Sequence, residues 1–131
     1  MATLVTVFDE TTSGERTNSL TLEFLTARVT ARELIRRRVY EEVQEYNLST
    51  PEYFRGLVQP TEAEKVLNGY KLREWRKIDW EEQYARAVEA FERNGFFMLV
   101  DDRQVERLDE EIELKVATEV SFIKLVPLVG G

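Results

Sequence analysis

The residue types that this chain lacks limit the chemistry available to it. The 131-residue sequence contains neither cysteine nor histidine. Their absence excludes Ser-His-Asp and Cys-His catalytic arrangements and the usual zinc ligand sets. Catalysis would have to rely on carboxylates, lysine, tyrosine or a hard metal ion. A hydrolase with a pair of carboxylates therefore stays open as the enzymatic alternative, because such a pair leaves no signature in a sequence.

The strongest candidate for a reactive group lies at the end of the sequence, which reads SFIKLVPLVGG. Glycine has the least steric bulk of all residues, so Gly130 and Gly131 would let an α-carboxylate pass through a narrow channel. A carboxylate is a poor acyl donor, so activation would have to take place inside a covered active site of another enzyme. Pro127 would stiffen the segment that leads there. Fraying of a chain end, or a cloning remnant, would also be compatible with two terminal glycines.

Charge and composition restrict the partners. With 25 acidic and 18 basic residues the net charge is −7, which argues against nucleic acid and favours a partner that carries positive charge. The acidic runs VDDR and LDEEIE lack the spacing and the glycine of an EF-hand, and no glycine-rich phosphate loop is present. We therefore expect no metal site and no bound cofactor. The start MATLVTVFDETT resembles no signal peptide and no stretch reaches the length of a membrane span, so we expect a cytoplasmic protein without a membrane partner.

Alternating apolar residues predict a hairpin in the first quarter of the chain. Strands are expected over 3–9 and 18–24, separated by a turn that contains a glycine. Thr30 and Glu33 have capping-box spacing and predict the start of a helix that ends near Asn47. Its apolar stripe should contain Leu34, Ile35, Val39, Val43 and Tyr46. The cluster Arg36, Arg37 and Arg38, next to Glu41, Glu42 and Glu45, is interpreted as a solvated helix face.

The last third of the sequence has the features of several short strands. We expect a strand over 96–100, a tight turn at Asp101 and Asp102, and a short strand that contains Gln104 and Val105. A one-turn element is expected between Leu108 and Ile112, before a long strand over 119–126.

The intervening residues 48–94 are interpreted as an ordered helical insertion. Thr61 and Glu64 have capping-box spacing and predict a helix over 61–67, and a longer helix is expected over 79–93. Trp75, Arg76 and Trp80 could form a binding face, although burial of the tryptophans against the domain is the simpler interpretation. Apolar spacing in the longer helix excludes a disordered linker.

The order of these segments resembles the ubiquitin-like β-grasp family. TVFDETTSGERTNSLTLEF and VTARELIRRRVYEEV are similar to the family's first hairpin and main helix, and GFFMLVDDRQVERLDEEIEL is similar to its later strand and turn. VSFIKLVPLVGG has an alternating apolar strand followed by an apolar-x-Gly-Gly ending. The resemblance implies an α+β fold with one domain over 1–131. Its core would be 3–47 and 95–131, and the insertion 48–94 would have no counterpart in ubiquitin.

The resemblance also implies a function. The chain would be a ubiquitin-like protein modifier and not an enzyme. Its C-terminal diglycine would be the conjugation site, Gly130 and Gly131, and a separate E1-like adenylating enzyme would activate the Gly131 carboxylate with ATP and magnesium. Transfer, with a possible E2-like enzyme, would form isopeptide bonds with target proteins in a bacterial conjugation system.

The tail departs from ubiquitin, whose activating enzymes read arginines. Here Pro127 and Val129 flank Leu128, so an activating enzyme would need an apolar channel, with Leu125 as a further contact. Two alternatives remain: a sulfur carrier that forms a C-terminal thiocarboxylate, and an interaction module that is not conjugated. Lys124 occupies a position where the resemblance leads us to expect an apolar residue.

Overall fold

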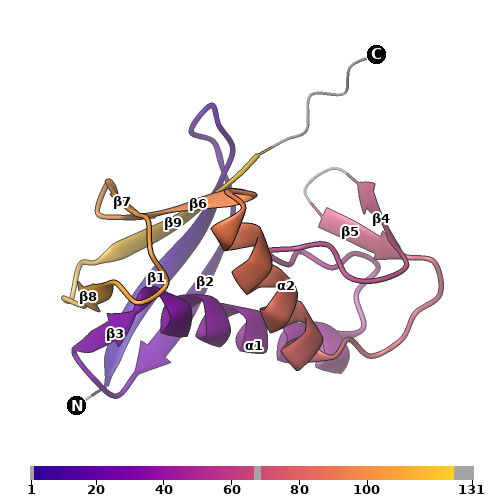
Figure 1. The fold of residues 1–131 in the computed structure, drawn as a ribbon. Coiled ribbons are helices and arrows are strands. Elements are labelled where there is room, and N and C mark those ends of the chain that lie inside the picture. The colour runs from indigo at the N-terminus through magenta and orange to yellow at the C-terminus, as the bar shows by residue number, and fades with distance from the viewer. Residues whose placement is uncertain (1, 67–68, 126–131) are drawn as a thin grey trace.

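The computed structural model describes residues 2–66 and 69–125, which form a mixed α+β structure (Figure 1). Five strands make one sheet in the order β2-β1-β9-β6-β7. Their bounds are Thr3–Glu10 for β1, Arg16–Phe24 for β2, Phe96–Val100 for β6, Arg103–Val105 for β7 and Glu119–Lys124 for β9. β1 and β9 pair in parallel, whereas the other neighbours are antiparallel. The first and last strands of the chain therefore lie side by side inside the sheet.

The predicted hairpin is confirmed. Val5 and Val7 of β1 are fully buried, and Leu22 and Phe24 of β2 are buried on the same side of the hairpin. Gly14 has a φ of 89° in the connecting turn, a conformation that glycine adopts without steric cost. The alternation of apolar and polar residues along each strand thus gives the hairpin one apolar face.

The predicted start of the main helix, α1 (Ala31–Ser49), is also confirmed, because the Thr30 hydroxyl accepts a hydrogen bond from the backbone N–H of Glu33. The five residues of the predicted apolar stripe are all buried. The helix ends close to the predicted position near Asn47: it continues to Ser49 and is capped by Thr50 in the left-handed conformation. The Asn47 side chain exchanges two hydrogen bonds with the backbone of Ile78, at 2.9 and 3.0 Å.

The predicted helix over 61–67 is wrong. A small hairpin of β4 (Ala63–Val66) and β5 (Gly69–Leu72) takes its place. Thr61 does not cap a helix, because its hydroxyl bonds the side chains of Glu82 and Arg86, at 2.6 and 2.8 Å. The longer helix is confirmed as α2 (Trp80–Glu92), with Asp79 as its N-cap.

The last third differs from expectation at two places. One is the strand expected over 119–126, which is β9 and ends at Lys124; residue 126 lies outside the described residues. The strand over 96–100, the turn at Asp101 and Asp102 and the short strand are confirmed. The other place is between Arg107 and Glu110, where there is a hydrogen-bonded turn, followed by strand β8 (Glu111–Glu113), which pairs with β3 (Arg28–Thr30). These two strands were missed because three residues are too few to show an alternation pattern.

Segment 48–94 contributes to the same hydrophobic cluster as the sheet and α1. Its buried members are Phe54, Leu57, Leu72, Ile78, Ala87 and Phe91. Figure 1 shows α2 crossing close to α1, with the β4–β5 hairpin beyond it. None of the described helices has the length and apolar composition needed to cross a bilayer.

A Gly56→Ala substitution tests how tightly segment 48–94 packs. A Cβ atom at Gly56 would overlap the ring of Phe54, which is almost fully buried. Because the ring has little room to move, the variant should lose about 1–3 kcal/mol of unfolding free energy. Urea denaturation measures the loss, and an unchanged midpoint would show that the segment packs loosely.

Candidate functional site

Most of the residues predicted to act lie outside the described part of the chain. Pro127, Leu128, Val129, Gly130 and Gly131 belong to 126–131, of which nothing is described. Leu125 is described, and it is 40% exposed directly after the end of β9. The structure therefore places one predicted recognition residue at an accessible point where the chain leaves the sheet (Figure 1).

The strand that leads to this point is held on both sides. β9 pairs with β1 from Glu119 to Ile123 and with β6 from Val120 to Lys124. Val120 and Phe122 are fully buried. A central strand with two hydrogen-bonded neighbours is among the most rigid elements of a fold. The exit of the chain at Leu125 is thus a fixed point relative to the sheet.

A buried ion network lies directly beneath this exit. The guanidinium of Arg38, on α1, is fully buried and donates to both carboxylate oxygens of Asp9, on β1; the Nη2–Oδ2 bond is 2.8 Å long. Arg38 Nε donates to Glu42 Oε2 at 3.0 Å, and the backbone N–H of Leu57 donates to Glu42 Oε1 at 3.0 Å. The guanidinium also lies 4.7 Å from the centroid of the Phe122 ring, on β9. The network joins β1, α1, β9 and segment 48–94.

Burial and pairing oppose each other in this network. Burial alone would raise the pKa of Asp9, but the bidentate Arg38 guanidinium outweighs it and lowers the pKa below its usual value. For Glu42 burial prevails over the Arg38 charge, so its pKa is raised. Arg38 remains charged because its two carboxylate partners raise its pKa further despite burial. The Arg38 guanidinium therefore forms ion pairs with two carboxylates whose pKa values are shifted in opposite directions.

Lys124, the last residue of β9, connects the network to segment 48–94. Its Nζ donates to the Gly56 carbonyl oxygen at 2.5 Å and lies 3.7 Å from Asp9 Oδ2. Burial lowers the pKa of Lys124, and the Arg38 charge acts in the same direction, while Asp9 opposes them. A lysine at this position thus holds segment 48–94 against the strand that leads to the tail.

The predicted solvated face is wrong for Arg38 and Glu42. Arg36 is exposed and Arg37 is half-exposed, as expected, but Arg38 and the Glu42 side chain are buried. The signal was present in the spacing, since position 38 lies four residues after Leu34 on the apolar stripe. Asp9 and Lys124 give the same signal, because they continue the alternation of Val5 and Val7 and of Val120 and Phe122. Charged residues at core positions of a pattern indicate a buried network.

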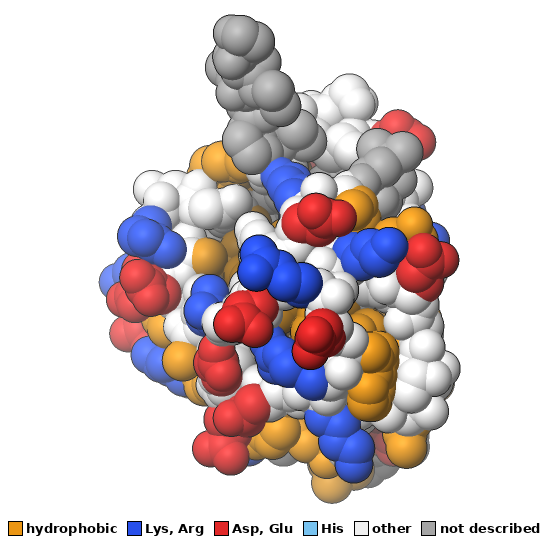
Figure 2. Space-filling model, turned by 90° about the vertical axis from the view of Figure 1, so that its right-hand side faces the viewer, with side chains coloured by type: hydrophobic (Ala, Val, Ile, Leu, Met, Phe, Trp, Pro, Cys, Tyr) orange, Lys and Arg blue, Asp and Glu red, His pale blue; other side chains and the backbone are white. Residues whose placement is uncertain are grey.

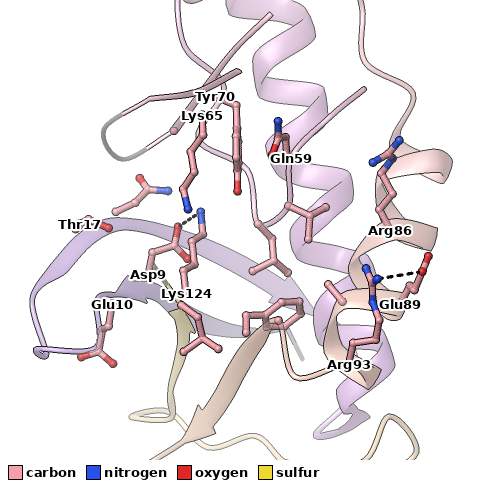
Figure 3. A pocket seen from close by; sticks show the side chains of 18 of the residues that line it. Asp9, Glu10, Thr17, Gln59, Lys65, Tyr70, Arg86, Glu89, Arg93 and Lys124 are labelled. Carbon is pink, nitrogen blue, oxygen red and sulfur yellow. Dashed lines mark ion pairs between the residues drawn. The ribbon is translucent and has the colours of Figure 1, made fainter. Parts of the chain in front are cut away.

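A cavity of about 690 Å³ opens beside the network (Figure 3). It lies between the end of β9 and three parts of segment 48–94, which are residues 57–59, the β4–β5 hairpin and α2. Its lining includes Asp9 and Lys124 from the sheet, Lys65 and Tyr70 from the small hairpin, and Leu125. The described residue of the predicted recognition tail, Leu125, therefore borders the cavity.

The surface shown in Figure 2 carries mixed charge, with basic and acidic side chains interspersed between apolar patches. Among the residues that the structure describes, no group of three acidic side chains could hold a metal ion. Trp80 is half-buried with its ring 5.3 Å from that of Tyr40, whereas Trp75 is 48% exposed and stacks on Tyr46. The interpretation that the tryptophans are buried against the domain therefore fits Trp80 better than Trp75.

No known protein family, curated protein or solved structure matches this chain. Any function assigned to it therefore depends on the chemistry and geometry of its own residues.

Proposed function

We propose that the chain is a ubiquitin-like protein modifier with a β-grasp fold. In this proposal a separate E1-like enzyme adenylates the Gly131 carboxylate with ATP and magnesium, and the acyl group is conjugated to amines of target proteins. Gly130 and Gly131 pass through the enzyme's narrow channel because they have no side chains. The chain itself is a substrate and supplies no catalytic residue.

The observation that carries the proposal is the position of β9. The final strand lies in the interior of the sheet, parallel to β1, and its carboxyl end leads to the exposed Leu125. The described order of hairpin, helix packed on the sheet and later strands agrees with the layout that the resemblance implies. A tail that begins at a rigid strand can be presented to another enzyme without disturbing the core.

The ion network supports this arrangement. It connects Lys124 to Asp9, and Asp9 to Arg38 on the helix, so the last residue of β9 is held by side chains as well as by backbone pairing. The apolar sequence from Leu125 to Val129 would then give the activating enzyme its recognition contacts. The proposal requires a free α-carboxylate at Gly131.

Deletion of Gly130 and Gly131 tests the proposal. A tagged chain expressed in its native cells should form slower-migrating adducts that survive denaturation and reduction, and the deletion should remove them completely. The matched control is the Lys115→Gln variant, because Lys115 is exposed and lies before β9, outside the tail. This control should keep the adducts.

The same experiment separates the alternatives. If adducts persist after deletion, the modifier proposal is wrong. A sulfur carrier would form no adducts, and the intact protein, gently prepared, would show one terminal oxygen replaced by sulfur. An interaction module would bind its partner equally well after deletion and without ATP, and a hydrolase would still turn over its substrate.

A further inference from the structure

The cavity beside the end of β9 gathers two lysines and a tyrosine from different elements. Lys65 and Tyr70 are direct partners in the β4–β5 hairpin, and side chains of such partners lie on the same face. Lys124 Nζ lies 5.9 Å from the centroid of the Tyr70 ring. Figure 3 shows Lys65, Tyr70 and Lys124 extending toward the same end of the cavity. Residues that are distant in sequence therefore bring two ammonium groups together.

The acidic side chains that line this cavity already have partners. Both oxygens of Asp9 accept hydrogen bonds from Arg38. Three other carboxylates pair with arginines, in the ion pairs Glu10–Arg16, Glu82–Arg86 and Glu89–Arg93. Within residues 2–66 and 69–125, Lys65 forms no ion pair, and Lys124 has only the 3.7 Å contact with Asp9, which it shares with Arg38. The described lining carries equal numbers of acidic and basic side chains, and its one cation without a paired carboxylate among the described residues is the Lys65 ammonium.

Directed hydrogen-bond donors accompany this charge. Burial raises the pKa of Tyr70, and the nearby carboxylates Glu42 and Asp9 raise it further, so its phenol remains protonated at neutral pH. The Lys124 ammonium uses one N–H on the Gly56 carbonyl oxygen, which fixes its position and leaves other N–H groups. Two ammonium groups and a phenol are hydrogen-bond donors that suit the several oxygens of an oxyanion, and a phosphate monoester is such a group.

The size and the remaining walls indicate what else the ligand contains. A volume of about 690 Å³ is in the range of cavities that hold small organic molecules, and it exceeds the needs of a bare phosphate. Leu57, Val58, Phe96 and Leu125 provide apolar surface in the same cavity. An organic group attached to the phosphate would cover that surface.

We propose that this cavity binds a small organic phosphate. Lys65, Lys124 and Tyr70 donate hydrogen bonds to the phosphate, Lys65 supplies the positive charge that opposes it, and the apolar walls contact its organic group. This site goes beyond the modifier proposal and does not depend on it, since Leu125 is the one residue that the two proposals share and the phosphate contacts involve only Lys65, Tyr70 and Lys124.

Titration of the ¹⁵N-labelled protein at low salt tests the site with three probes: phenyl phosphate, inorganic phosphate and phenol. Phenyl phosphate should shift amide resonances of β4, β5 and β9 saturably and should bind more tightly than either other probe. Lys65→Gln should weaken its binding by about two- to fivefold, the upper part of the range for one exposed charge contact. Tyr70→Phe should weaken it as well, without removing a charge. The matched control is Lys71→Gln on the same hairpin, because Lys71 does not line the cavity; it should leave the affinity unchanged.

Three results would overturn the proposal. One is an absence of saturable shifts with phenyl phosphate. Another is equal weakening by Lys65→Gln and Lys71→Gln, which would indicate general attraction to the surface. The last is binding of inorganic phosphate or phenol as tight as that of phenyl phosphate. The spectra themselves report whether each variant is folded, and Lys65 is exposed, so its substitution leaves the core intact.

Discussion

Replacing Arg38 with methionine is expected to lower the free energy of unfolding by about 3–5 kcal/mol. The side chain is fully buried, and its guanidinium holds the carboxylates of Asp9 and Glu42. Methionine fills a similar volume but leaves two carboxylates in the interior without their main counter-charge. Urea denaturation followed by the fluorescence of Trp75 and Trp80 measures the change.

Arg37→Met is the matched control for this prediction. Arg37 is a neighbour on the same helix, and the ion pair that it forms within the described residues, with Glu41, is partly exposed and 3.4 Å long. Exposed pairs contribute little, so this variant should stay within about 0.5 kcal/mol of the unmodified protein. If Arg38→Met costs no more than Arg37→Met, the network does not stabilise the fold.

Replacing Phe54 with alanine should cost about 3–5 kcal/mol, because the site cannot collapse around the missing ring. Phe54 is 1% exposed, and its ring packs edge-on against Tyr46 of α1 with centroids 5.2 Å apart. Its backbone exchanges two hydrogen bonds with Tyr70, at 2.7 and 2.8 Å, which hold the chain in place. The same urea denaturation measures the loss.

This prediction tests whether segment 48–94 belongs to the core of the sheet and α1. Tyr53→Ala is the control, since Tyr53 is the adjacent aromatic residue and is 41% exposed. It should shift the urea midpoint only slightly. An equally small shift for Phe54→Ala would contradict the packing described above and would make the segment an appendage of the domain.

Elements with strong local signals could be predicted from the sequence. The first hairpin has strict alternation, and α1 has a cap at Thr30, so both were found close to their true bounds. The helix expected over 61–67 failed although Thr61 and Glu64 have the spacing of a cap. Its segment is short, and tertiary bonds from Thr61 to α2 prevailed over local preference.

The candidate site was less accessible to prediction. The exposed position of Leu125 agrees with its expected role as a contact, but the role itself stays a prediction. Arg38 was assigned to solvent because three consecutive arginines suggest a charged face. Only the pairing of β1 with β9 brings Asp9 beneath α1 and beside Lys124, and sequence spacing contains no information about that pairing. The cavity depends on the hairpin that was mistaken for a helix.

Mass spectrometry of conjugates tests the modifier proposal most directly. Protein recovered from native cells under denaturing conditions and digested with trypsin would be cleaved after Lys124, which leaves LVPLVGG as the remnant of this chain. The proposal predicts this remnant in isopeptide linkage to lysines of other proteins, and its disappearance when Gly130 and Gly131 are deleted. Recovery of LVPLVGG only as an unbranched peptide with a plain carboxylate would contradict it.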